Sequence, residues 1–487
     1  MKVRVRYAPS PTGRQHIGGV RTALFDYFFA RSHNGSFILR IEDTDQARTT
    51  EEAMQDLYDT WAWLGISWDE GPDKGGPYGP YIQSERAEVY KQYADKLVAG
   101  GHAYPCYCSQ DRLDSLREEQ EKNKRDIGYD RKCRELAEEE RRRLAAGSVP
   151  VIRLKVPLEG ETTVPDLLRG DVTRKNRDIP ADPVLLKSDG LPTYHLAVVI
   201  DDHLMEISHV LRGQEWLPSA QIHMLIYQAL EWAPPVFCHL PIVLGKDGQK
   251  LSKRHGSTSL RAFMEAGYLP EAIINYVSLL GWSYDDQREF FSKEELEKLF
   301  SLDKLNKAPA VFDYKKLEWF NGQYIRRKSD KELEDLLLPY LRRDGLISDP
   351  LTSQEGRMVE GMMPLVKERL KLLPEVSDLV RFLFKEVGIE DSGLLVPKKL
   401  DAQTVLETLK SSRNIMAGFS ERADEENEGL FRDAAEELGV KLGDMLMPLR
   451  VAVTGSTSSL PLFGSMRLLG AEKTVQRIDA AIRLLES

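Results

Sequence analysis

Two short loops of this chain carry residues that could bind phosphate groups. The first reads Ala8-Pro9-Ser10-Pro11-Thr12-Gly13 and leads into His16-Ile17-Gly18-Gly19 at the mouth of a predicted helix. Prolines stiffen such a loop, and glycines let the backbone approach a ligand closely. A helix N-terminus offers unpaired N–H groups and partial positive charge, and His16 can donate a hydrogen bond to a phosphate oxygen as charge develops. Taken alone, the same residues also suit a plain turn and helix cap.

The second loop is Lys250-Leu251-Ser252-Lys253-Arg254, preceded by Gly245-Lys246-Asp247-Gly248. Lysines on a loop bounded by glycines can close over a triphosphate and neutralise the charge that develops at the phosphorus under attack. A run of this kind on its own is more often a group of surface lysines. The chemical interpretation therefore depends on finding both loops in one chain.

Together the two loops resemble the two signature sequences of class I aminoacyl-tRNA synthetases. Gly19 stands where the first signature usually ends in a second histidine, a departure that is common in the glutamyl branch. The all-helical C-terminal third resembles the bacterial glutamyl type, because glutaminyl and archaeal-type relatives carry β-barrels there. The segments that resemble the glutamyl branch extend over essentially the whole chain and include Arg40–Asp45, Tyr78–Arg86, Leu186–Gly190, Pro192–Ala197, Asp201–His203, Arg212–Trp216 and Asn321–Ile325.

This resemblance implies an enzyme that activates glutamate with ATP and passes it to the terminal ribose of tRNA(Glu), with tRNA(Gln) as a second acceptor left open. It implies a glutamate site made of Arg6, Ala8, Ser10, Glu42, Tyr194 and Arg212. In that site Arg6, Tyr194 and Arg212 bind the side-chain carboxylate through charge-assisted bonds, while Glu42 and Ser10 bind the α-ammonium group. We expect glutamine to leave two buried guanidinium groups uncompensated, which rejects an analogue by roughly 10⁴-fold or more. The alternative is that Arg6 and Glu42 merely pair across neighbouring strands.

For ATP, the resemblance implies a site made of His16, Gly18, Gly19, Glu215, Lys246, Lys250, Ser252 and Lys253. Lys253, on the leaving pyrophosphate, ranks first as a catalytic residue, and His16 and Lys250 are the other catalytic candidates. A general base is not needed, because the carboxylate of glutamate is already a nucleophile at neutral pH. Catalysis is then expected to depend on positioning and charge stabilisation, with Mg²⁺ on the phosphates.

Three of the four cysteines, Cys106, Cys108 and Cys133, fall within a short charged segment, whereas Cys238 lies in an apolar run typical of a core. Clustered thiols in a long chain of this composition indicate a metal more than a disulfide. Three thiolates fit a zinc site that needs one more ligand. Tyr129 and Glu135 are the candidates for that ligand, and some bacterial glutamyl synthetases carry zinc at this place. The alternative is three reduced structural thiols.

The residues of both loops require an α/β unit to position them. The pattern predicts strands at Val3–Tyr7 and Phe37–Ile41 and helices at Val20–Arg31 and Thr49–Leu64, the latter capped by Thr49 or Thr50. Strands that alternate with helices, with reactive residues at strand ends, are typical of a Rossmann-like parallel sheet. Beyond residue 330 the pattern is helical. We expect a catalytic domain at 1–100 and 190–240, an inserted acceptor-binding domain at 101–189, a stem-contact domain at 241–329 and helical anticodon-binding bundles at 330–487.

Composition places the chain among ordinary globular proteins. Hydrophobic residues make up 41% and charged residues 30% of its 487 residues, with a net charge of −10. This acidity argues against non-specific coating of nucleic acid, although one structured RNA can still bind a local basic face. We find no apolar run long enough to span a membrane and no signal-peptide core, so we expect a cytoplasmic protein. The resemblance implies a monomer.

Two other functions remain to be tested. One is that of a truncated paralogue that glutamylates a modified tRNA base but ends near residue 300, which the long helical C-terminal part disfavours. The other is that of a non-catalytic RNA-binding relative that keeps the fold without the chemistry, which the presence of Arg6, Glu42, Arg212 and Lys253 disfavours.

Overall fold

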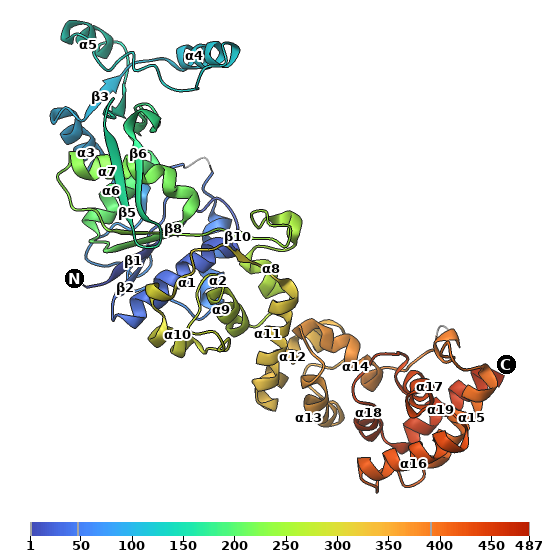
Figure 1. The fold of residues 1–487 in the computed structure, drawn as a ribbon. Coiled ribbons are helices and arrows are strands. Elements are labelled where there is room, and N and C mark those ends of the chain that lie inside the picture. The colour runs from blue at the N-terminus through green and yellow to red at the C-terminus, as the bar shows by residue number, and fades with distance from the viewer. Residues whose placement is uncertain (1, 46–47, 390–391, 487) are drawn as a thin grey trace. The chain divides into compact units, whose positions relative to one another are not determined.

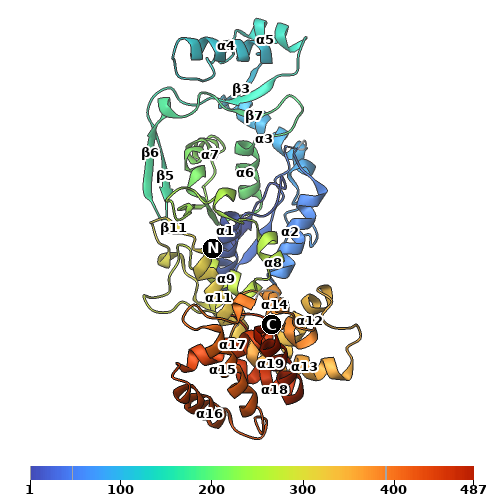
Figure 2. The ribbon, with the colours of Figure 1, turned by 90° about the vertical axis from the view of Figure 1, so that its right-hand side faces the viewer.

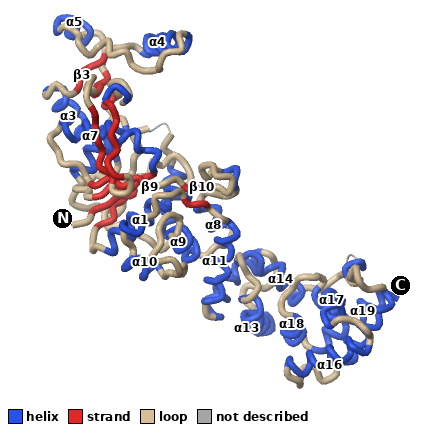
Figure 3. Tube along the Cα trace, in the orientation of Figure 1, coloured by secondary structure: helices blue, strands red, loops and turns tan. Residues whose placement is uncertain are grey.

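The computed structural model describes residues 2–45, 48–389 and 392–486, which form two compact units. Unit 1 comprises residues 1–264 and 273–313, and unit 2 comprises residues 265–272 and 314–487. Within the described ranges every strand belongs to unit 1, and unit 2 is helical (Figure 3). The strands are β1 Arg4–Tyr7, β2 Ser36–Leu39, β3 Ala103–Cys106, β4 Val151–Leu154, β5 Glu161–Asp166, β6 Gly170–Lys175, β7 Val184–Leu186, β8 His209–Gly213, β9 Val236–Leu240, β10 Val243–Leu244 and β11 Ala310–Val311.

The helices follow the same division. Unit 1 contains α1 Ile17–Ser32, α2 Glu51–Trp63, α3 Ala87–Ala99, α4 Gln110–Lys122, α5 Glu138–Ala145, α6 Tyr194–Leu204, α7 Leu217–Ala229 and α10 Lys293–Leu299. Unit 2 contains α11 Tyr314–Arg327, α12 Asp330–Arg343, α13 Ser353–Lys367, α14 Val376–Phe384, α15 Ala402–Ile415, α16 Asp424–Glu437, α17 Leu442–Thr454, α18 Leu462–Leu469 and α19 Ala471–Glu486. Residues of α8 Leu260–Glu265 and α9 Pro270–Ser278 fall on both sides of the division.

The core of unit 1 is a parallel sheet, as the sequence pattern predicts. Strand β1 pairs in parallel with β2, and β8 pairs in parallel with β9. Ser208, just before β8, joins the two pairs through a 2.9 Å hydrogen bond from its N–H to the carbonyl of Arg4. Only glycine fits at position 35, just before β2, because a Cβ there would lie 2.4 Å from the Val3 carbonyl oxygen. The carboxyl ends of β1, β2 and β8 therefore come together at one edge, where such sheets bind ligands.

Helix α1 crosses this sheet and is buried along most of its length. Phe25 and Phe28 are at most 1% exposed, and both rings pack against Phe300 of unit 1 at centroid distances of 5.2 and 6.2 Å. Such an all-round apolar helix is stable only when other elements cover it, here β1, β2, β8 and α10. Helix α2 begins as expected, since the Thr50 hydroxyl accepts the Ala53 N–H at 3.2 Å.

The segment between α3 and α6 forms an antiparallel sheet of β3, β4 and β7 and a long hairpin of β5 and β6. In both views, α4 and α5 lie beyond the end of that hairpin that is remote from β8 (Figures 1 and 2). The turn end of the hairpin joins the central sheet, because β5 pairs in parallel with β9 where Asp166 faces Phe237. The order of this sheet is β6-β5-β9-β8.

Unit 2 consists of helices that pack in two groups. Helices α12, α13 and α14 contact one another around Leu333, Leu337 and Met362, which are fully buried. Helices α15, α16, α17 and α19 contact one another around a second apolar cluster that contains Leu409 and Leu449. Helix α18 contacts members of both groups. Across the described part of the chain, no helix is both long and apolar enough to cross a lipid bilayer.

Shortening Phe28 tests the packing of α1. We expect Phe28→Ala to lower the free energy of unfolding of unit 1 by about 3–5 kcal/mol, because it removes a fully buried ring and leaves a cavity. Val236→Ala is the control, since Val236 is 43% exposed and its loss is expected to cost within about 0.5 kcal/mol. Calorimetric unfolding of both variants measures the difference. Equal effects would show that α1 does not depend on this ring.

Candidate active site

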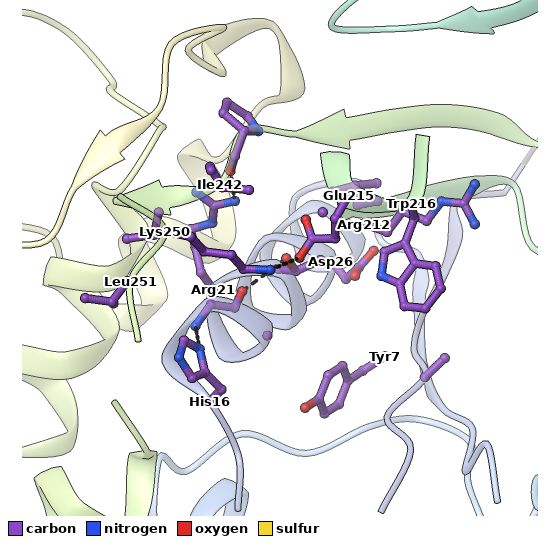
Figure 4. A pocket seen from close by; sticks show the side chains of 18 of the residues that line it. Tyr7, His16, Arg21, Asp26, Arg212, Glu215, Trp216, Ile242, Lys250 and Leu251 are labelled. Atoms are coloured by element: carbon purple, nitrogen blue, oxygen red, sulfur yellow. Dashed lines mark hydrogen bonds and ion pairs between the residues drawn. The ribbon is translucent and has the colours of Figure 1, made fainter. Parts of the chain in front are cut away.

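One cavity of about 450 Å³ lies in unit 1 at the carboxyl edge of the parallel sheet. It brings together most of the predicted site residues: Arg6, Ala8, His16, Gly18, Gly19, Glu42, Tyr194, Arg212, Glu215 and Lys250. Figure 4 shows His16 and Arg21 on α1 at one side and Arg212 and Trp216 at the other. Ser10, Lys246, Ser252 and Lys253 do not line the cavity.

The two signature loops lie next to each other. Ser259, after the lysine loop, forms an antiparallel bridge with His16. The backbone N–H of Ile17 donates to Thr258 at 2.8 Å, and that of Leu260 donates to Gln15 at 2.8 Å. These bonds hold the segment after the lysine loop against the start of α1.

His16 presents one ring nitrogen to the cavity. Its Nδ1 accepts the N–H of Gly18 at 3.0 Å, which caps α1. Loss of solvent around the ring, followed by the charge of Lys250, lowers the pKa of His16 from its ordinary 6.5. The ring is therefore neutral at pH 7, and because Nδ1 is an acceptor, Nε2 carries the proton. That N–H is a donor suited to a phosphate oxygen.

Two of the three lysines in and before the second loop form ion pairs with acidic side chains. Lys250 Nζ lies 3.0 Å from Glu215 Oε1 across the cavity (Figure 4), and Lys246 Nζ lies 3.0 Å from Asp313. Lys253 is exposed at the start of a short 3-10 turn, Lys253–His255. His255 holds this turn, with Nε2 3.0 Å from Asp247 and Nδ1 3.0 Å from the Ser252 N–H. Exposed ion pairs contribute little, so an anion can displace them at low cost.

Arg212, near the end of β8, is 6% exposed and lines the cavity. Its Nε donates to His239 at 3.0 Å, and its Nη1 donates to the Tyr194 hydroxyl at 2.9 Å. Its Nη2 is buried and has no hydrogen-bond partner among the described residues. Burial raises the pKa of Tyr194, so its hydroxyl keeps its proton. Since that hydroxyl accepts from Arg212, its proton is available to a carboxylate.

Arg6 and Glu42 do not pair with each other. Asp202 accepts from Arg6 Nε at 3.0 Å and from Arg40 Nη1 at 2.7 Å, while Arg40 Nη2 donates to Glu42 at 3.0 Å. The expectation that both Arg6 and Arg212 would be uncompensated without a substrate carboxylate is therefore wrong for Arg6, which has Asp202. Of the two, only Arg212 has a buried nitrogen without a partner.

Sequence reasoning missed four cavity or network residues: Arg21, Asp26, Arg40 and Asp202. Asp26 lines the cavity with both carboxyl oxygens buried and unpartnered among the described residues, and burial raises its pKa well above the ordinary 3.8. A lone acid in the apolar run Leu24–Phe28 was the available signal. Arg21 also lines the cavity, and its Nη2 donates to the Pro241 carbonyl at 2.5 Å.

The three clustered cysteines come together in space. Their sulfurs lie within 4.8 Å of one another, as a metal site requires. The Tyr129 hydroxyl lies 3.3 Å from Cys106 Sγ and 3.6 Å from Cys108 Sγ. The side chain of Glu135 is 77% exposed and pairs with Lys155 at 3.2 Å. Cys238 is fully buried on β9, as expected of a core residue.

Removing the shared carboxylate tests the network below the cavity. Asp202→Asn is expected to lower the free energy of unfolding by about 3–5 kcal/mol, because it removes the ion-pair partner of the buried Arg6 and one of the partners of the buried Arg40. Burial raises the pKa of Asp202, but Arg6 and Arg40 outweigh it and the net shift is downward. The difference in free energy of unfolding between the wild type and Asp202→Asn should therefore be constant at pH values above the ordinary pKa of 3.8. It should vanish as the pH falls through the lowered pKa of Asp202 in the folded protein.

Urea titrations at several pH values measure this difference. Glu121→Gln, which removes an exposed pair with Arg117, is the control and should cost no more than about 1 kcal/mol. A loss in Asp202→Asn no larger than in the control would contradict the structural role of the network.

Comparison with known proteins agrees with this geometry. Residues 2–319 match the family described as tRNA synthetases class I (E and Q), catalytic domain, and residues 332–482 match an anticodon binding domain. A glutamate–tRNA ligase of Borreliella burgdorferi is 54% identical over 486 residues, covering 100% of this chain and 99% of that protein. One of Treponema denticola is 53% identical over 502 residues and covers 99% of each chain.

Solved structures extend the match to the fold. A glutamate–tRNA synthetase of Elizabethkingia anophelis superposes with a TM-score of 0.85 at 36% identity, covering 99% of this chain and 100% of its own. A glutamate–tRNA ligase of Elizabethkingia meningosepticum, solved with its amino acid, gives 0.84 at 36% identity and covers 100% of both chains. With full-length relatives, both matched domains and the two loops at one cavity, this chain belongs to the glutamate–tRNA ligases, a branch of the class I aminoacyl-tRNA synthetases.

Proposed function

We propose that this enzyme activates L-glutamate with ATP, forming glutamyl-adenylate and pyrophosphate, and then transfers the glutamyl group to the terminal ribose of tRNA(Glu). The observation that carries the proposal is the buried, unpartnered Nη2 of Arg212 beside the Tyr194 hydroxyl. Both residues line the cavity that the His16 and Lys250 loops share. A charged nitrogen held dry in this way favours a ligand carboxylate.

In this proposal the side-chain carboxylate of glutamate binds Arg212 Nη2 and the Tyr194 hydroxyl, with Arg6 as a further cation. The α-ammonium binds Glu42 and Ser10, next to Ala8. Glutamine would leave Arg212 without a countercharge, and a site with such an unpaired buried group rejects the analogue strongly. The discrimination thus depends on one guanidinium group rather than two.

The triphosphate of ATP, with its Mg²⁺, is expected to bind at the start of α1. His16 Nε2 donates to the phosphates there, and Gly18 and Gly19, which have no side chains, let the phosphates approach the start of the helix. The ion pair between Lys250 and Glu215 opens, which frees Lys250 for phosphate and Glu215 for the nucleoside part of ATP. The remaining residues of the proposed ATP site reach the phosphates when the lysine loop closes. They are Lys246, Ser252 and Lys253.

The first step needs no proton transfer. An oxygen of the α-carboxylate attacks the α-phosphorus, and the bond to the pyrophosphate oxygen breaks as the lysines neutralise the departing charge. In the second step a ribose hydroxyl attacks the acyl carbon, the bond from that carbon to the phosphate oxygen breaks, and AMP leaves with the hydroxyl proton on its phosphate. Preorganised charge, rather than a general base, supplies the rate enhancement.

The five-part domain division, including an acceptor-binding insertion at 101–189 and anticodon-reading bundles at 330–487, stays a prediction. It is supported by the antiparallel sheet and hairpin between α3 and α6 and by the anticodon-domain match at 332–482. That match, together with relatives of equal length, disfavours the truncated paralogue. The monomeric state and the cytoplasmic location also stay predictions.

We also propose that Cys106, Cys108 and Cys133 bind zinc with Tyr129 as the fourth ligand. The three sulfurs converge, and the Tyr129 hydroxyl already lies against two of them. Glu135 is less suited, because its exposed carboxylate pairs with Lys155. Bound zinc would hold β3 and the segment around Cys133 together.

Replacing Lys253 tests the proposed catalysis. In pyrophosphate exchange with glutamate, ATP and total tRNA, Lys253→Ala should lower kcat about 10²–10³-fold, because a charge on the leaving pyrophosphate is lost. The KM for glutamate should stay within about twofold, since Lys253 acts away from the amino acid. Lys298→Ala, an exposed lysine on α10, is the control. Undiminished exchange would remove Lys253 from the mechanism.

The same assay decides between the enzyme and a non-catalytic relative. Wild-type protein that gives no glutamate-dependent exchange, with or without tRNA, would support the binding-protein alternative. Charging of purified tRNA(Glu) and tRNA(Gln) then separates a strict enzyme from one that also serves tRNA(Gln).

The zinc proposal predicts metal in protein purified without chelator. Elemental analysis should give about one zinc per chain, as in structural sites with four ligands. Cys133→Ser and Tyr129→Phe should lower that content, whereas Cys238→Ala and Glu135→Gln should leave it unchanged. Metal-free wild-type protein, or loss of zinc in Glu135→Gln alone, would contradict the assignment.

A further inference from the structure

Arg212 is held from behind by two buried side chains in series. Its Nε donates to His239 Nε2 at 3.0 Å, and His239 Nδ1 lies 2.7 Å from Asp166 Oδ2. His239, on β9, is 0% exposed, and Asp166, at the end of β5, is 4% exposed. Neither residue lines the cavity, and the side chain of His239 reaches a cavity residue through Arg212.

Hydrogen-bond chemistry fixes the state of the middle ring. A guanidinium group only donates, so His239 Nε2 must be the acceptor, and a carboxylate only accepts, so Nδ1 must carry the proton. Burial, which outweighs the pair with Asp166, lowers the pKa of His239 from its ordinary 6.5, and the ring is neutral. A doubly protonated ring would set one N–H donor against another. In the chain Asp166–His239–Arg212, both hydrogen bonds are therefore donated in the same direction, from Arg212 to His239 and from His239 to Asp166.

Two further histidines, His223 and His195, lie on the other side of Arg212. Nη1 lies 3.3 Å from His223 Nδ1, and His223 Nε2 lies 3.2 Å from His195 Nδ1. Together with Tyr194, these contacts occupy Nε and Nη1 and leave Nη2 as the nitrogen without a partner. The partners of Arg212 thus select Nη2 as the guanidinium nitrogen that is left for a ligand.

Asp166 is itself held by backbone, so it is a rigid base for this chain. Its Oδ1 accepts the N–H groups of Leu168 and Arg169 at 3.0 and 2.8 Å. Its Oδ2 accepts the backbone N–H of His239 at 2.9 Å. Asp166 belongs to the β5–β6 hairpin and faces Phe237 of β9 at the point where the hairpin joins the central sheet.

We propose that Asp166 and His239 are positioning residues that aim the free edge of Arg212 at the side-chain carboxylate of the amino acid. The β5–β6 hairpin thereby sets the affinity for glutamate from outside the pocket. This inference rests on the proposed function, because it assigns the ligand of Arg212. It adds two residues that touch neither substrate nor the reacting atoms.

The test compares two changes at His239 in the full-length enzyme. His239→Leu removes the acceptor for Arg212 Nε, so the KM for glutamate should rise roughly 10- to 100-fold, the effect of losing a hydrogen bond to a charged group. The KM for ATP should stay within about twofold. His239→Gln, whose amide oxygen can accept from Nε, should recover most of the glutamate affinity. His209→Gln, on β8 but in contact with Ser208 and Phe29 instead, is the matched control.

Pyrophosphate exchange at varied glutamate and varied ATP gives both constants, and thermal unfolding reports whether each variant folds. An unchanged KM for glutamate in His239→Leu would overturn the inference. So would equal losses in the Leu and Gln variants, or a loss confined to kcat, since either result indicates a merely structural histidine. If His239→Leu does not fold, the inference is tested by comparing the KM for glutamate of His239→Gln with that of Asp166→Asn. The amide of Asp166→Asn faces the ring with a donor, so its KM must rise well above that of His239→Gln. Wild-type enzyme without glutamate-dependent exchange would instead refute the proposed function.

Discussion

The carboxylate of Asp202, shared by the guanidinium groups of Arg6 and Arg40, is the interaction on which the rest of the site depends. Both arginines are at most 5% exposed, and charges taken so far out of water are tolerated only when paired. Asp202 supplies that pairing from α6, and Glu42 binds the far side of Arg40. The network joins β1, the end of β2 and α6 beneath the cavity. The network therefore stabilises the floor of the pocket, although arginines in such a position often bind substrates.

This arrangement divides the cations of the pocket by role. Arg6 is neutralised from within the protein, whereas Arg212 keeps one buried nitrogen without a partner. A site of this kind carries its positive charge where the ligand's negative charge will lie, so little reorganisation is needed on binding. The lysines of the second loop follow the opposite principle. They are exposed and paired with Glu215 and Asp313, so they can move to a phosphate when ATP arrives.

The sheet order β6-β5-β9-β8 connects the segment between α3 and α6 to this pocket. Asp166 comes from β5, His239 from β9 and Arg212 from β8, so three neighbouring strands each contribute one member of a single hydrogen-bonded chain. A segment that sequence patterns separate from the catalytic unit thus shares a sheet and a polar network with it. The cysteine cluster lies in the same segment, at the end of β3.

Local sequence determined the elements and the family. Alternating patterns gave β1, α1, β2 and α2 within a few residues, Thr50 caps α2 as its side chain predicts, and the two signature loops indicated the enzyme class. Only the tertiary structure decided which buried charges are paired within the protein and which remain available to a ligand. Arg6 and Arg212 look alike in sequence, but their partners come from residues far along the chain, and only folding brings Asp202 to one and His239 to the other. Pairing of buried charges depends on distance in space, which a linear pattern does not contain.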